Sequence, residues 1–98
     1  MALKIVWTPQ SEKGLGKVVK YLEENWTAKE IKELETNIED FLKRVSKYPK
    51  IYPATFKYKN VRKGLVDKNN YIIYRIKPRE RIIEIINFRG TRQKPLNE

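Results

Sequence analysis

The order of apolar segments along the chain predicts an α+β fold, in which a helical hairpin packs on a mostly antiparallel four-stranded sheet. Three observations predict it: a short apolar run opens the chain, two segments with helical periodicity follow, and three strand-like runs close it. The expected element order is therefore β-α-α-β-β-β. Because 98 residues are enough for one hydrophobic core, we expect a single domain over residues 1–98.

The chain is expected to begin with a strand and a first helix. The apolar run Leu3–Trp7 stops at Thr8 and Pro9. Threonine is a favoured N-cap, and proline fits the first helical position because its missing N–H has no partner there. Gly14 and Gly16 each weaken this helix by about 1 kcal/mol relative to alanine. One apolar face follows from the residues at helical spacing, which are Leu15, Val18, Val19, Leu22 and Trp26.

A second helix has a clear start signal. Thr27 and Glu30 match the T-x-x-E capping box, in which each side chain satisfies a free backbone donor of the other residue. Tyr48 and Pro49 end the helix. With no room for a long connection after Trp26, the two helices should form an antiparallel hairpin. The predicted core stripe of the second helix consists of Ile31, Leu34, Ile38, Phe41, Leu42 and Val45.

Three strands are predicted after an irregular segment at 50–60. Their expected ranges are Val61–Val66, Tyr71–Lys77 and Arg81–Phe88, with turn signals between them. Short connections of this kind join antiparallel neighbours. The last two strands are apolar on both faces, so we expect them at the centre of the sheet. The tail at 91–98 is polar, and we expect it to be mobile.

The charge of the chain is concentrated in its second half. Residues 1–40 contain six basic and eight acidic side chains, whereas residues 41–95 contain 16 basic side chains and three acidic ones. The net charges of these segments are therefore −2 and +13. A field of one sign over half of a small domain favours an anionic partner, either a nucleic acid or an acidic protein segment.

The composition argues against several classes of function. Without histidine or cysteine, the common zinc, Ser-His-Asp and Cys-His sites are impossible, and no G-x-G-x-x-G or Walker loop is present. We therefore expect neither a metal nor a cofactor. No apolar run approaches the roughly 20 residues of a membrane helix, and the N-terminus lacks the apolar region of a signal peptide. The absence of cysteine fits a cytoplasmic protein without a membrane partner.

Basic side chains near the predicted strands are the candidate site residues. Arginine presents a planar fork of donors suited to phosphate oxygens, and nearby Tyr52, Phe56 and Tyr58 are able to stack on unpaired bases. Arg75 is either part of this basic surface or an ion-pair partner of Glu84. The residues predicted to bind a nucleic acid or another target are Lys57, Lys59, Arg62, Lys63, Arg89 and Arg92. We expect Arg62 and Arg92 at the surface.

Three stretches of the chain resemble the RelE/ParE superfamily of toxins from type II toxin–antitoxin systems. One stretch resembles the superfamily's N-terminal strand and first helix; its sequence is KIVWTPQSEKGLGKVVKYLEENW. Its basic strand and the strand after it resemble VRKGLVDKNNYIIYRI, and its closing strand resembles IIEIINFRGTRQKP. The Arg-Gln-x-Pro ending is familiar from plasmid-stabilisation members, and the resemblance extends from Lys4 to Pro95.

The resemblance implies a toxin that is neutralised by a small antitoxin, which wraps across the toxin and covers its basic surface. Some superfamily members cleave mRNA in the ribosomal A site, whereas members of the ParE kind block DNA gyrase and are not nucleases. By resemblance, the candidates for catalytic roles in a nuclease are Arg62, Arg89 and Arg92. Tyr71 occupies the position at which nuclease members begin the next strand with an arginine.

The nuclease members also carry a C-terminal tyrosine, or a His-Tyr pair, that transfers protons. This chain has no aromatic residue after Phe88, and arginine is a poor base because its pKa exceeds 12. Endoribonuclease activity therefore stays an open alternative beside gyrase inhibition. Two further alternatives are a non-toxic nucleic-acid-binding module and a decayed toxin that is retained for antitoxin binding and operon repression.

Overall fold

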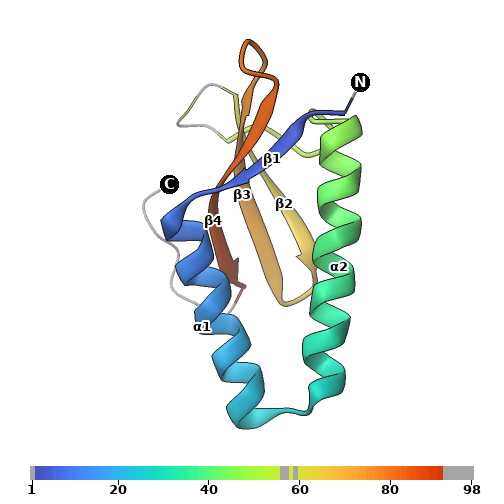
Figure 1. Ribbon diagram of the computed structural model, residues 1–98, viewed down its shortest axis with the longest axis vertical. Helices are drawn as coiled ribbons and strands as arrows, with labels where there is room; N and C mark the ends of the chain where they lie inside the picture. Colours follow the sequence, from blue (N-terminus) through green and yellow to red (C-terminus); the bar gives the residue numbers. More distant parts are fainter. Residues whose placement is uncertain (1, 56–57, 59, 92–98) are drawn as a thin grey trace.

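Four strands form one sheet, and two helices arranged as an antiparallel hairpin pack on one of its faces (Figure 1). This computed structural model describes residues 2–55, 58 and 60–91. The α+β class and the element order agree with the prediction. The elements are β1 (Lys4–Trp7), α1 (Pro9–Asn25), α2 (Ala28–Lys47), β2 (Val61–Asp67), β3 (Asn70–Lys77) and β4 (Ile82–Gly90).

The strand order in the sheet is β1-β4-β3-β2. Strands β2, β3 and β4 form the predicted antiparallel meander, and β3 and β4 are the central strands as expected. β1 lies at an edge and pairs with β4 in parallel, from Lys4 opposite Ile82 to Trp7 opposite Ile85. No helix within the described part of the chain is long and apolar enough to cross a membrane.

Helix α1 begins with a capping box that also ties the helix to the sheet. Thr8 is the predicted N-cap, and its backbone N–H donates to Ser11 Oγ at 2.9 Å. Ser11 N–H donates in return to Thr8 Oγ1 at 3.2 Å. The Thr8 hydroxyl donates to the carbonyl of Ile85 at 2.8 Å, which fixes the helix start against β4. Ser11 is fully buried and was not recognised from the sequence as part of this cap.

The two glycines of α1 have different structural roles. A Cβ atom on Gly14 would lie 2.2 Å from the carbonyl oxygen of Phe88, so α1 approaches the backbone of β4 closely at this point. Gly16 has open space around it. The prediction that Trp26 continues the apolar face was wrong, because Trp26 is the C-cap residue and 57% of its surface is exposed.

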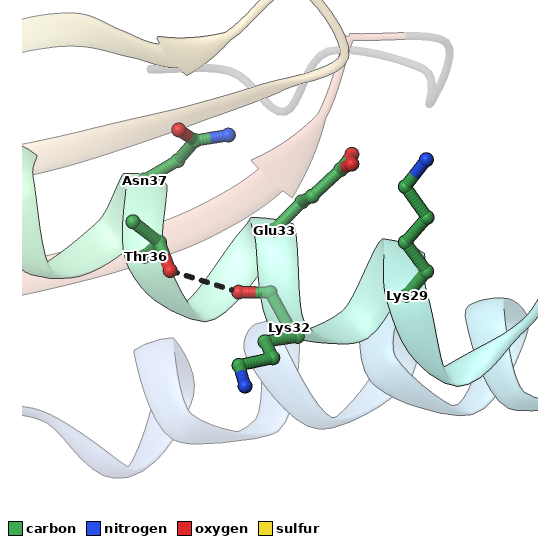
Figure 2. Close-up of a pocket in the computed structure, with 5 residues that line it drawn as sticks. All are labelled: Lys29, Lys32, Glu33, Thr36 and Asn37. Carbon is green, nitrogen blue, oxygen red and sulfur yellow. Dashed lines mark hydrogen bonds between the residues drawn. The ribbon is translucent and has the colours of Figure 1, made fainter.

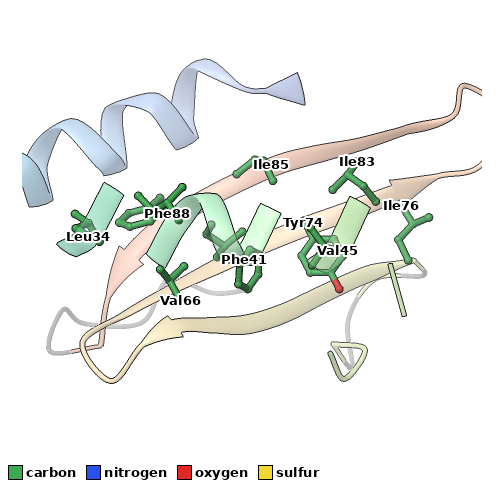
Figure 3. Packing of buried hydrophobic residues seen from close by; sticks show 11 residues of the cluster. Leu34, Phe41, Val45, Val66, Tyr74, Ile76, Ile83, Ile85 and Phe88 are labelled. Carbon is green, nitrogen blue, oxygen red and sulfur yellow. The ribbon is translucent and has the colours of Figure 1, made fainter. Parts of the chain in front are cut away.

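The core lies between the helices and one face of the sheet (Figure 3). The capping box of Thr27 and Glu30 is present at the start of α2, and its hydrogen bonds lower the pKa of Glu30. Ile31 and Leu42 are only partly buried. The buried residues of the predicted stripe are Leu34, Ile38, Phe41 and Val45. They face a sheet surface that consists mainly of Ile72, Tyr74, Ile76, Ile83, Ile85 and Phe88.

The segment after α2 folds back over β2. The Tyr52 ring stacks on Phe41 with 4.9 Å between ring centroids, and it also covers Gly64, where a Cβ atom would lie 2.5 Å from the ring. The next residues pair with the outer edge of β2, since Lys63 N–H donates to the carbonyl of Pro53 at 3.3 Å. The segment therefore covers an edge that would otherwise be free for pairing.

The glycines of α1 provide a matched test of the close approach between α1 and β4. We expect Gly14→Ala to lower the free energy of unfolding by about 1–3 kcal/mol, because the added methyl group displaces backbone rather than a flexible side chain. Gly16→Ala should raise the free energy of unfolding by about 0.5–1 kcal/mol through helix propensity. Urea unfolding of both variants measures the difference, and equal stabilisation by both substitutions would contradict the close approach.

Candidate functional site

The face of the sheet that points away from the helices is the candidate site, and we call it the distal face. Side chains of a strand alternate between the two faces, so this face is formed by the residues that alternate with the core positions. Its apolar centre consists of Val61, Tyr71 and Ile73, with Ile86 packed against them. The cations placed on it by strand register are Lys4, Lys63, Arg75, Lys77 and Arg89.

Two of these cations form ion pairs with the same acidic neighbour. Glu84 lies 3.4 Å from the Lys77 ammonium and 4.0 Å from the Arg75 guanidinium. Arg75 therefore takes the ion-pair role that the sequence left as one of two possibilities. Among the described residues that strand register places on the distal face, Glu84 is the single carboxylate, so the face keeps a net positive charge.

Lys63 and Arg89 are both neighbours of Tyr71 on the distal face. The Lys63 ammonium lies 4.3 Å from the centroid of the Tyr71 ring, a cation–π contact worth about 0.5–1 kcal/mol at an exposed site. Tyr71 stands directly opposite Arg89 in the pairing of β3 with β4, so both side chains share the distal face. The three residues form a row across β2, β3 and β4, which we call the Lys63–Tyr71–Arg89 row.

From the sequence, Tyr71 was expected to begin a strand at the position where nuclease members of the superfamily have an arginine, and no site role was predicted for it. The signal that could have revealed its role is the alternation of β3, which places Tyr71 on the same face as Ile73 and opposite to Ile72. Across the predicted hairpin, that face also receives Lys63 from β2. A bulge between Leu65 and Asp67 shifts the register of β2 on β3, so counting outward from the turn would have paired Lys63 with Tyr74 instead.

Arg62 does not share a face with Lys63. It stands opposite Tyr74 in the sheet, and its Nη1 donates to the carbonyl of Tyr52 at 2.7 Å and to that of Lys50 at 3.4 Å. The expectation of an Arg62 side chain at the surface was therefore wrong, because the residue is half-buried and anchors the segment after α2. Lys57, Lys59 and Arg92 lie outside the described residues.

Tyr74 is a hydrogen-bond donor inside the fold. Its hydroxyl donates to the carbonyl of Pro49 at 2.7 Å. Burial raises the pKa of Tyr74 to about 12, against the opposing effect of the Arg62 charge. The phenol therefore stays neutral at physiological pH and is not a general base.

The distal face offers a set of ammonium and guanidinium donors that can bind anionic oxygen atoms.

A separate groove of about 420 Å³ lies along the first half of α2 (Figure 2). Lys29, Lys32 and Glu33 line it together with Thr36, whose hydroxyl donates to the carbonyl of Lys32 at 3.1 Å. Its lining mixes both charges on an exposed helix surface. It shares no residue with the Lys63–Tyr71–Arg89 row.

A family model described as the ParE toxin of the type II toxin–antitoxin system, parDE, matches residues 5–95. The chain belongs to this family. The ParE fold seen here is also similar to that of a solved structure titled as the YoeB dimer from Staphylococcus aureus, with a TM-score of 0.61 and 15% sequence identity. That likeness covers 91% of this chain and 97% of the other, and at this identity it concerns the fold alone. A comparison with curated proteins finds no significant match.

Neighbouring basic residues on β2 should respond differently to truncation. We expect Arg62→Ala to lower the free energy of unfolding by about 1.5–3 kcal/mol, because two backbone carbonyls lose a charged donor. Lys63→Ala should cost less than about 1 kcal/mol, the size of an exposed cation–π contact. Chemical denaturation of the two variants distinguishes them, and similar losses would show that Arg62 is not an anchor.

The raised pKa of Tyr74 predicts a pH dependence of stability. Because the phenol has a higher pKa in the folded chain than in the unfolded chain, its contribution is complete below about pH 10 and is lost as the pH rises toward about 12. We expect the stability difference between the parent chain and Tyr74→Phe to shrink over this range. Urea unfolding from pH 9 to pH 12 measures it, and a constant difference would contradict the burial of Tyr74.

Proposed function

We propose that this ParE-family chain is a growth-inhibiting toxin that binds an anionic surface of its target through the distal face. The observation that carries the proposal is the Lys63–Tyr71–Arg89 row, which holds two cations on a sheet whose opposite face is packed against the helices. A rigid support of this kind lowers the entropic cost of placing long basic side chains on a target. A cognate antitoxin would silence the toxin, as the family membership suggests.

The proposed target is DNA gyrase, and the proposed action is binding rather than RNA cleavage. Cleavage by attack of a 2′-hydroxyl needs a group that removes and returns protons. The chain has no histidine, the phenol of Tyr74 is held as a donor, and Glu84 is engaged by Arg75 and Lys77. The match to the ParE toxin family supports the same choice. This target also requires the cytoplasmic location expected from the sequence.

Two assays on the purified chain test the proposed target. Inhibition of gyrase supercoiling, with ribosome-bound mRNA left intact in a bacterial translation extract, would support the proposal. Cuts clustered in the A-site codon would instead identify a ribosome-dependent endoribonuclease. No effect in either assay, with normal growth on overexpression, would favour a decayed toxin. Binding to free nucleic acid without growth inhibition would favour a nucleic-acid-binding module, with a log–log salt slope of about −0.7 to −0.9 per phosphate.

The distal face should carry the toxicity. We expect the double variant Lys63→Gln with Arg89→Gln to inhibit growth at least about tenfold less, since a hydrogen bond to a charged group contributes about 1.5–3 kcal/mol. The matched control is Lys17→Gln with Lys20→Gln, which removes the same charge from exposed positions of α1. Growth on induced expression is the measurement, with thermal unfolding to verify that both variants fold. Equal loss of toxicity in both double variants would show that the effect depends on net charge and not on the distal face.

A further inference from the structure

The turn between β3 and β4 forms one end of the molecule. It lies at the opposite end of the long axis from the connection between the two helices (Figure 1). The paired strands end with Lys77 opposite Ile82, and Arg81 N–H donates to the carbonyl of Pro78 at 3.2 Å across the turn. The four residues 78–81 are all exposed. Together they make a compact turn, which we call the hairpin tip.

The backbone at Arg81 has a conformation that arginine rarely adopts. Its φ is 57°, in the left-handed region that glycine and asparagine occupy at less steric cost. The turn and β1 together hold this conformation, because Arg81 N–H is bonded to Pro78 and its carbonyl accepts from Lys4 N–H at 3.0 Å. For stability alone, asparagine or glycine would suit position 81 better. The value of this arginine therefore lies in its side chain.

The hairpin tip carries two guanidinium groups that are available to an anion. Within the described part of the chain, neither Arg79 nor Arg81 forms an ion pair. The carboxylate of the tip is that of Glu80, which lies 3.9 Å from the Lys77 ammonium. Lys4 adds an exposed cation at the base of the tip. The tip therefore presents unpaired positive charge at the end of a paired, hydrogen-bonded support.

We propose that the hairpin tip binds the phosphate backbone of double-stranded DNA. Arginine suits this ligand because its planar fork of donors binds two phosphate oxygens at once. Contacts of this kind position a protein on the duplex without reading its sequence. The site is distinct from the Lys63–Tyr71–Arg89 row, because Tyr71 is six residues before Lys77 along β3, or about 20 Å in an extended strand.

The chemistry of the tip disfavours other ligands. Single-stranded nucleic acids are bound by stacking bases on aromatic side chains, and residues 77–82 include no aromatic residue. A protein partner would be expected to cover apolar side chains, but none of the exposed large apolar side chains of the described chain lies in the tip. The choice of DNA over an RNA duplex rests on the proposed function, because gyrase holds double-stranded DNA.

The test measures binding of the full chain to a short fluorescent DNA duplex by anisotropy at several salt concentrations. We expect Arg79→Gln with Arg81→Gln to weaken the affinity about tenfold or more, and to make the log–log salt slope shallower by about 1.8, the amount for two phosphate contacts. The matched control, Lys29→Gln with Lys32→Gln, removes the same charge from exposed positions at the start of α2. It should change the affinity less than about threefold.

A single substitution at position 81 separates binding from folding. Arg81→Asn should raise the melting temperature by about 2–6 °C, because asparagine accepts a positive φ more readily than arginine does. The same variant should bind the DNA duplex more weakly, with a salt slope shallower by about 0.9. A loss of DNA binding in a more stable protein cannot come from misfolding.

Three results would overturn the inference. Equal weakening by the two double variants would show that DNA binding depends only on net charge. Unchanged affinity after Arg79→Gln with Arg81→Gln would remove the tip from the contact. Tighter binding to an RNA duplex or to polyglutamate than to the DNA duplex would assign the tip to another partner. The proposed function is tested separately, by gyrase inhibition and by growth, and would survive each of these results.

Discussion

Helix α2 packs its buried stripe against one face of the sheet, and the rest of the molecule is arranged around that contact. Phe41 and Val45 are fully buried there, facing Tyr74 and Ile85. Because strand side chains alternate, each residue packed toward the helices sends its neighbours to the distal face. The core therefore determines, residue by residue, which basic side chains are available to a target and which become part of the fold.

Arg62 and Lys63 illustrate this division most clearly. They are adjacent in sequence and similar in charge, but Arg62 anchors the segment after α2 through the Tyr52 carbonyl, whereas Lys63 rests on the Tyr71 ring of the distal face. Tyr52 in turn stacks on Phe41, so the anchor is continuous with the core.

Most of the fold could be predicted because its signals are local. The caps at Thr8 and Thr27, the stripe of α2 and the turns between strands all lie within a few residues of the elements that they define. Two features that the sequence did not reveal depend on contacts between distant segments. The requirement for glycine at Gly14 depends on Phe88, and the burial of Arg62 depends on carbonyls 10 and 12 residues earlier. Of the residues in the proposed site, Lys63 and Arg89 were named from the sequence, whereas Tyr71 between them was not.

Photo-crosslinking from the distal face in growing cells can show whether this face binds the cellular target. A photoreactive residue at Leu65, which is 55% exposed on the distal face of β2, would lie next to a bound target. The same residue at Lys20, exposed on α1, serves as the comparison. If the distal face binds the target, crosslinks to it should form from position 65 and not from position 20. Crosslinks to that target from position 20 alone would show that the distal face is not the binding surface.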